Sequence, residues 1–201
     1  METVMRALGF VLLLAMPFAL SGCFPAVVAV GSETAAVVAQ ERSVGNAVDD
    51  TGILLQIKNS FAGKDFKGLF ANVEVKVVEG RVLLTGNVDK PESQVEAVRL
   101  TWEVSGVVEV IDEIQVNDKS SFWNYTRDVW ISTQIRARLL ATKGIRSVNF
   151  SVLTVNQVVY IMGIAQNQME LDKVTYIAST TSYVQRVVSY ARFKDDPRRK
   201  G

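Results

Sequence analysis

Apolar residues recur at every fourth position in two segments of the chain, 53–61 and 131–139. The residues of these two lines are Ile53, Ile57 and Phe61, and Ile131, Ile135 and Leu139. Because residues four apart lie on one face of an α-helix, each line predicts a helix that packs against a core. We therefore expect two core-facing helices, far apart in the sequence.

Alternation of apolar and polar residues follows the first predicted helix. Val73, Val75 and Val77 are separated by polar residues, and Glu79 and Gly80 precede a second apolar stretch at 81–85. Alternation with a period of two beside a glycine-containing turn is typical of a β-hairpin. The sequence thus predicts two antiparallel strands after the helix.

Two further helices are indicated by pairs of residues with the spacing of a capping box. The pairs are Asp89 with Glu92 and Asn167 with Glu170. Valine-rich stretches at 107–116 and 184–193 then predict closing strands. The resulting order, α-β-β-α-β, predicts an α+β fold in which two helices cover one face of a small mixed sheet.

The whole pattern occurs twice. A shift of 77 residues aligns positions of the same apolar or glycine type without a gap. The aligned pairs are Val75 with Val152, Val82 with Val159, Leu84 with Ile161, Gly86 with Gly163, Leu100 with Ile177, Val107 with Val184, Val110 with Val187 and Val116 with Phe193. The opening helices align at a shift of 78. Such self-similarity predicts two tandem copies of one unit, at 49–118 and 123–194, joined by a linker at 119–122.

The first 22 residues have the pattern of an export signal, with Arg6 before an apolar stretch. Residues 7–23 are too few, at 17, for a membrane-spanning helix, which needs about 20 predominantly apolar residues. Met5 is an alternative start because it places a basic residue directly before the apolar stretch. We expect a signal peptide at 1–22.

The segment Leu20-Ser21-Gly22-Cys23 resembles the lipobox of bacterial lipoproteins. The resemblance implies that Cys23, the sole cysteine, carries acyl chains including palmitate and becomes the N-terminus of a tether at 23–48. Phe24 stands where an Asp would favour retention in the inner membrane, so the resemblance implies the outer membrane. The alternative is a lone cysteine that follows an apolar stretch by chance.

Composition weighs against catalysis. The chain has 201 residues, 48% of them hydrophobic, with no histidine and one cysteine. This excludes histidine bases, histidine-ligated metals and an internal disulfide. Adjacent carboxylates at 49–50 and 112–113 are acid/base candidates, but a solvated edge or a helix cap explains them more simply. We expect no enzyme activity, no catalytic residues, no metal and no cofactor.

The α-β-β-α-β unit with a glycine at the end of its second strand, Gly86 or Gly163, resembles the BON domain. The whole chain resembles the family of dual-BON outer-membrane lipoproteins of Gram-negative bacteria. The segments that carry this resemblance are the lipobox, Arg42-Ser43-Val44-Gly45 with Val48-Asp49-Asp50, and Asp128-Val129-Trp130-Ile131-Ser132-Thr133. It implies binding of anionic phospholipid and a place at division sites. The second unit departs from the first at Gln157, where the first has its turn glycine, and at Tyr183, which replaces Gly106.

Charge is distributed unevenly along a chain whose net charge is +1. Residues 49–118 hold 13 acidic and 7 basic residues, a net charge of −6, while residues 123–201 hold 12 basic and 5 acidic residues, a net charge of +7. Basic residues near an anionic bilayer each contribute about 1 kcal/mol to binding. The second unit is therefore expected to approach such a surface, and residues 195–201 are expected to form a frayed basic tail.

The helix that opens the second unit carries a second apolar face, away from its core line. On a helical projection this face groups Val129, Trp130, Thr133, Arg136, Ala137 and Leu140. Gly52 occupies the position of Trp130 in the first unit, so the shared fold does not require the indole. We predict that this face contacts lipid; the alternative is that Trp130 packs against the first unit. The aromatic residues Phe122, Trp123 and Tyr125 fit either arrangement.

These features predict a lipid-anchored protein on the periplasmic face of the outer membrane that supports envelope integrity. The expected partner is a membrane containing phosphatidylglycerol or cardiolipin, bound through the second unit. The alternative is a protein-interaction adaptor for outer-membrane assembly or for a regulator of a cell-wall amidase, with lipid only as tether. The near-neutral net charge gives no reason to expect a nucleic-acid partner.

Overall fold

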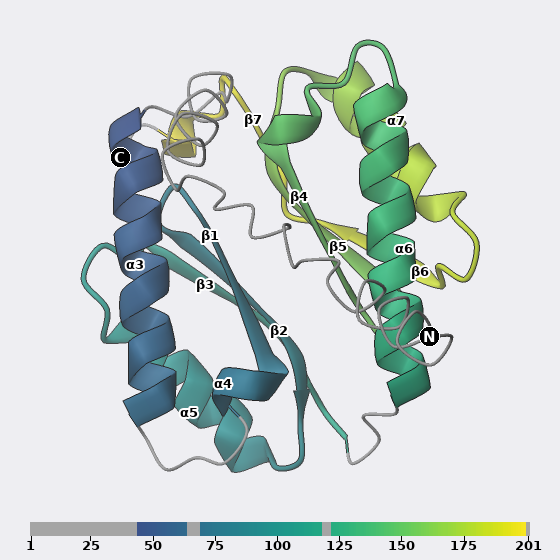
Figure 1. Cartoon of the computed structure of the whole chain (residues 1–201). Helices are drawn as coiled ribbons and strands as arrows, with labels where there is room; N and C mark the ends of the chain where they lie inside the picture. The colour runs from purple at the N-terminus through teal and green to yellow at the C-terminus, as the bar shows by residue number, and fades with distance from the viewer. Residues whose placement is uncertain (1–43, 64–68, 118–121, 200–201) are drawn as a thin grey trace, which may run out of the picture. The chain divides into compact units, whose positions relative to one another are not determined.

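The computed structural model describes residues 44–63, 69–117 and 122–199 (Figure 1). The first repeat consists of α3 (Val44–Gly63), α4 (Leu69–Asn72), β1 (Val73–Val78), β2 (Arg81–Val88), α5 (Pro91–Trp102) and β3 (Glu109–Val116). Its sheet has the order β1-β2-β3, with β1 antiparallel and β3 parallel to β2. The crossover from β2 to β3 runs through α5, as parallel strands require.

The second repeat follows the same plan. It contains α6 (Phe122–Ala141), the 3₁₀ turn η1 (Ser147–Asn149), β4 (Phe150–Val155), β5 (Val158–Ala165), α7 (Gln168–Ser179), β6 (Arg186–Ser189) and β7 (Arg192–Phe193), and ends in the 3₁₀ turn η2 (Pro197–Arg199). Strand β5 pairs antiparallel with β4 and parallel with β6 and β7. The predicted pair of tandem α-β-β-α-β units is confirmed.

The strand register repeats along with the sequence. Val75 pairs with Leu84 in the first sheet, and Val152 pairs with Ile161 in the second, both 77 residues further on. Gly86 in β2 and Gly163 in β5 are required to be glycine for one physical reason. A Cβ on either would lie 1.9 or 2.0 Å from the carbonyl oxygen of the residue before the first strand, Asn72 or Asn149.

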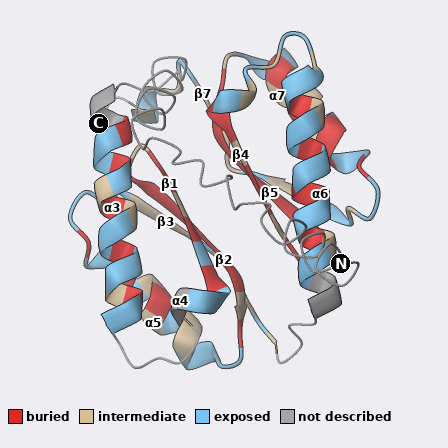
Figure 2. Ribbon diagram, viewed as in Figure 1, coloured by how far each residue is buried: buried red, intermediate tan, exposed pale blue. Residues whose placement is uncertain are grey.

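Each repeat has its own core between helices and sheet. The predicted line of the first helix is buried, with Ile53, Ile57 and Phe61 at most 5% exposed, and so is the line of the second. These side chains pack on the strand residues that point the same way, such as Val75 and Leu84. Figure 2 shows the buried residues along the strands and on the sheet-facing sides of α3 and α6.

A third apolar cluster joins the two repeats. It contains Val78, Leu83, Leu153, Val155, Tyr160 and Met162, which lie on the sheet faces that point away from the helices. Strand β5 is therefore buried on both faces, as its unbroken apolar run Val-Val-Tyr-Ile-Met would have indicated. Helices cover one face of each sheet, as predicted, and the cluster between the repeats covers part of the other face. The prediction did not say what covers that other face.

Each hairpin turn is held by a buried aspartate from the preceding helix. The carboxylate of Asp50 accepts hydrogen bonds from the backbone N–H groups of Glu79 and Gly80, both at 2.9 Å. Asp128 does the same for Asn156 and Gln157, at 2.7 and 2.8 Å. All four turn residues have positive φ, between 48° and 70°, as a two-residue hairpin turn of this hand requires.

These contacts correct the assignment of residues 49–50 to a solvated edge or a helix cap. Asp49 is exposed, but Asp50 is buried and serves the hairpin turn. The two residues of the other acidic pair, Asp112 and Glu113, also differ in their surroundings. Asp112 is exposed and accepts a hydrogen bond from Gln94, whereas Glu113 accepts one from Tyr190 of the second repeat.

Three helices begin at residues other than those that the sequence predicts. Asp89 is not a helix cap, because α5 begins after Lys90 with Pro91 in its first position, while Asn167 caps α7 as predicted. Helix α3 begins at Val44, within the segment 23–48 predicted as a tether. The linker ends before 122, because α6 begins there.

The segments around 184–199 also differ from expectation. The last strand is split into β6 and β7, and between them the backbone N–H of Ala191 donates to the hydroxyl of Ser189 while Tyr190 still donates to Ile161 of β5. The basic tail is not frayed up to Arg199. The guanidinium of that residue donates to both carboxylate oxygens of Glu79, at 2.8 and 2.9 Å, and only 12% and 11% of the two side chains is exposed.

Candidate functional site

The predicted lipid face lies on the outer surface of α6. Val129, Trp130, Thr133, Arg136, Ala137 and Leu140 are all exposed. Leu140 is exposed by 77%, Val129 by 47% and Trp130 by 42%, whereas the core line of the same helix is buried. Trp130 is therefore not a buried residue between the repeats.

Trp130 contacts an aromatic residue that the helical projection did not include. Its indole meets the ring of Tyr183 edge to face, with ring centroids 5.7 Å apart and planes inclined at 73°. The guanidinium carbon of Arg127 lies 5.8 Å from the centroid of the same tyrosine ring. We call Arg127, Trp130 and Tyr183 the aromatic cluster. It joins one edge of α6 to the loop between α7 and β6.

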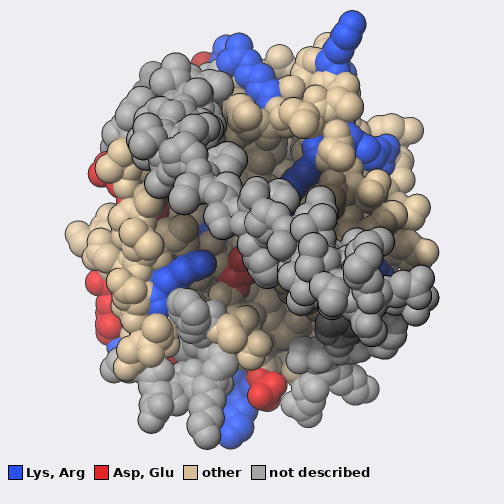
Figure 3. Space-filling view, in the orientation of Figure 1, with Lys and Arg blue, Asp and Glu red and all other residues tan. Residues whose placement is uncertain are grey.

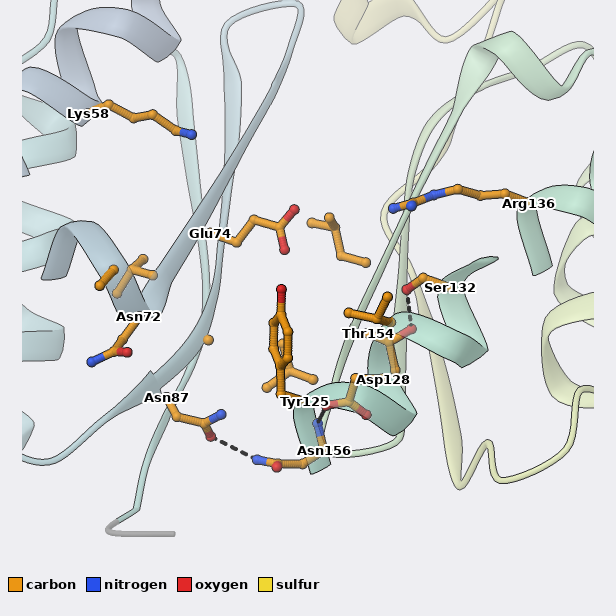
Figure 4. A pocket seen from close by; sticks show the side chains of 16 residues that line it. Lys58, Asn72, Glu74, Asn87, Tyr125, Asp128, Ser132, Arg136, Thr154 and Asn156 are labelled. Atoms are coloured by element: carbon orange, nitrogen blue, oxygen red, sulfur yellow. Dashed lines mark hydrogen bonds between the residues drawn. The ribbon is translucent and has the colours of Figure 1, made fainter. Parts of the chain in front are cut away.

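The opposite edge of the α6 face borders a cleft of about 550 Å³ between the repeats. Val129 is among its lining residues. Ser132 and Arg136 line it from the second repeat, and Lys58 and Glu74 from the first (Figure 4). Arg136 donates a hydrogen bond to the carbonyl oxygen of Val152 on the edge strand β4. Of the residues grouped by the projection, Val129 and Arg136 thus border the cleft, and Trp130 belongs to the aromatic cluster.

Tyr125 also lines the cleft, with its hydroxyl directed into it (Figure 4). This residue is exposed by 69% and does not contribute to the apolar cluster between the sheets. The side chains of Phe122 and Trp123 lie outside the described residues, as does Cys23.

Part of the positive charge of the second repeat is neutralised by the first repeat. Arg192 forms an ion pair with Glu109 at 2.7 Å, and Arg199 forms one with Glu79 at 2.8 Å. The net charge of +7 counted from the sequence therefore overstates what this repeat presents to a membrane. In Figure 3, basic side chains project from the half of the view that the second repeat occupies, and both basic and acidic side chains are visible on the half that the first repeat occupies.

Contacts between the two repeats shift the pKa values of two groups, Glu109 and Tyr190. Burial opposes ionisation of Glu109, but the hydrogen bond and charge of Arg81 and the charge of Arg192 outweigh it, so the pKa of this carboxyl is lowered. Burial, together with the hydrogen bond to the Glu113 carboxylate, raises the pKa of Tyr190. Both groups join the repeats and lie apart from the aromatic cluster.

No helix in the described part of the chain is long and apolar enough to cross a membrane. Within the same residues, no group of acidic side chains is arranged to hold a metal ion. The side chains that α6 exposes are apolar and aromatic, with basic neighbours.

The chain belongs to the BON domain family, whose model matches residues 49–118 and 127–195. It is 28% identical to the outer membrane lipoprotein DolP of Haemophilus influenzae, over 92% of this chain and 95% of that protein. It is also 44% identical to the "Uncharacterized protein in gshII 5'region" of Anaplasma centrale, over 76% of this chain and all of that protein. Osmotically-inducible protein Y of Escherichia coli is 31% identical over 72% of each chain. The predicted dual-BON family is confirmed.

Proposed function

We propose that this protein is lipid-anchored at the periplasmic face of the outer membrane and docks on anionic phospholipid through its second BON domain. The observation that carries the proposal is the exposed Trp130 on α6, in a basic repeat, at a position where the first repeat has glycine. An indole suits the headgroup boundary because its ring is apolar and its N–H is polar. Binding of this kind would support the integrity of the envelope.

The anchor is supported by the lipobox at residues 20–23 and by the similarity to an outer membrane lipoprotein. Acyl chains on Cys23 would contribute about 0.8 kcal/mol per buried methylene, so two or more chains hold a protein firmly. The 21 residues from Cys23 to the start of α3 span at most about 76 Å when fully extended. This reach lets the second repeat contact either the anchoring membrane or a nearby surface.

Sedimentation of the mature chain without its acyl group, residues 24–201, with vesicles tests the docking. Binding should require phosphatidylglycerol or cardiolipin, and should weaken as salt is raised, because the charges involved are exposed. Trp130→Glu should reduce binding by at least about tenfold, since it removes the inserted ring and adds a charge that the surface repels.

Trp102→Glu is the matched control. Trp102 is also an exposed indole, at the end of α5, but it lies in the acidic repeat. Its replacement should leave vesicle binding unchanged. If both variants bind like the wild type, the α6 face does not contact lipid, and the adaptor alternative would then explain its exposure better.

A further inference from the structure

The three residues of the aromatic cluster differ together from their counterparts in the first repeat. Arg127, Trp130 and Tyr183 stand where the first repeat has Asp49, Gly52 and Gly106. The first repeat builds the same fold with a reversed charge and two glycines at these positions. The cluster is therefore not needed to form a BON domain.

Space filling does not explain the cluster either. A Cβ added at Gly52 would meet no atom within 4 Å, so this position faces open space in the first repeat. In the second repeat, Trp130 and Tyr183 remain 42% and 62% exposed although their rings touch. Two large rings that are this accessible and contact each other present a surface instead of filling a core.

The backbone conformation at Tyr183 is unfavourable for any residue other than glycine. Its φ is +69°, in the left-handed region, where the first repeat has Gly106 at +91°. A side chain in this region costs free energy that glycine avoids. Non-glycine residues held in such conformations occur preferentially at functional sites, where the surroundings compensate the cost.

We propose that Tyr183 and Arg127 belong to the lipid-binding surface together with Trp130. The tyrosine ring holds the indole at headgroup depth. Arg127, placed over the face of that ring, presents its remaining N–H donors to the phosphate of an anionic phospholipid. The first repeat has the acidic Asp49 where the second has the basic Arg127. This reversal of charge favours a partner that is anionic over one that is only apolar. This inference rests on the proposed function and extends the site from one helix to a second loop.

Tyr183→Gly in the mature chain tests the proposal, because it restores the residue that the first repeat uses. The variant should unfold at the same temperature as the wild type or higher, since the left-handed backbone no longer carries a side chain. Binding to phosphatidylglycerol vesicles should nevertheless weaken by about three- to tenfold, the range expected for loss of one aromatic contact. Tyr183→Phe keeps the ring and should bind like the wild type.

Gln157→Gly is the matched control. Gln157 also has a left-handed backbone, with φ of +66°, at a position where the first repeat has a glycine, but it lies in the hairpin turn that Asp128 holds. This variant should gain the same backbone relief and keep full vesicle binding. A difference between the two variants therefore isolates the tyrosine ring.

Three results would overturn the proposal. One is wild-type binding by Tyr183→Gly while Trp130→Glu abolishes binding; the proposed function would then stand without this extension. Another is a clear drop in the unfolding temperature of Tyr183→Gly, which would assign the ring to the fold. The third is wild-type binding by both Tyr183→Gly and Trp130→Glu, which would remove the proposed function as well.

Discussion

Replacing Asp50 with alanine removes the acceptor for two backbone N–H groups of the first hairpin turn. Both hydrogen bonds measure 2.9 Å, and Asp50 is only 5% exposed, so water has little access to replace its carboxylate. A hydrogen bond to a charged group contributes about 1.5–3 kcal/mol, which gives a loss of about 3–6 kcal/mol for the pair. Since domains are stable by only about 5–15 kcal/mol, this loss should be evident in a urea titration followed by circular dichroism.

Asp49→Ala is the matched control for this experiment. Asp49 is the adjacent residue on α3 but is exposed, so its replacement should change the free energy of unfolding by no more than about 0.5 kcal/mol. Asp128→Ala should behave like Asp50→Ala, because it removes the equivalent pair of bonds from the second turn. A loss below about 1 kcal/mol for Asp50→Ala would refute the role assigned to the carboxylate.

Two further predictions concern the anchor and the interface between repeats. Cys23→Ser should release the protein from the membrane fraction, as fractionation and blotting would show; recovery in that fraction at wild-type levels, without an uncleaved leader, would contradict the anchor. Glu109 has a pKa below its ordinary value of 4.5 in the folded protein, so it stabilises the fold above that pH and loses this contribution as the pH falls through the lowered pKa. Glu109→Gln should therefore lose less stability than the wild type between about pH 7 and pH 3, and equal losses in urea titrations would refute the argument.

Local patterns in the sequence predict the interior of each repeat well. Ile57 and Ile135 are buried, as expected for apolar residues spaced by one helical turn, which share a face of the helix. This spacing can be read from the local sequence alone. The shift of 77 residues predicts the strand register, because equivalent pairs such as Val75 with Leu84 and Val152 with Ile161 must form the same ladder. These features depend on neighbours along the chain or on the second copy.

Contacts between distant segments could not be predicted in the same way. A charged residue near the start of a helix suggests a cap, and nothing local shows that Asp50 reaches a turn 29 residues later. Trp130 and Tyr183 are 53 residues apart, and no helical projection places them together. A comparison of the two repeats does contain a signal, because both residues replace glycines.

The ion pairs between Glu109 and Arg192 and between Glu79 and Arg199 mean that the repeats are not separable modules. Cutting the chain between them would expose two guanidinium groups and the apolar sheet face that includes Tyr160 and Met162. An excised second repeat would then expose more unpaired positive charge and more apolar surface than the same residues expose in the whole chain. Lipid affinities measured on the two halves would not sum to the affinity of the intact protein, so assigning its functions to one half or the other requires point variants of the full chain.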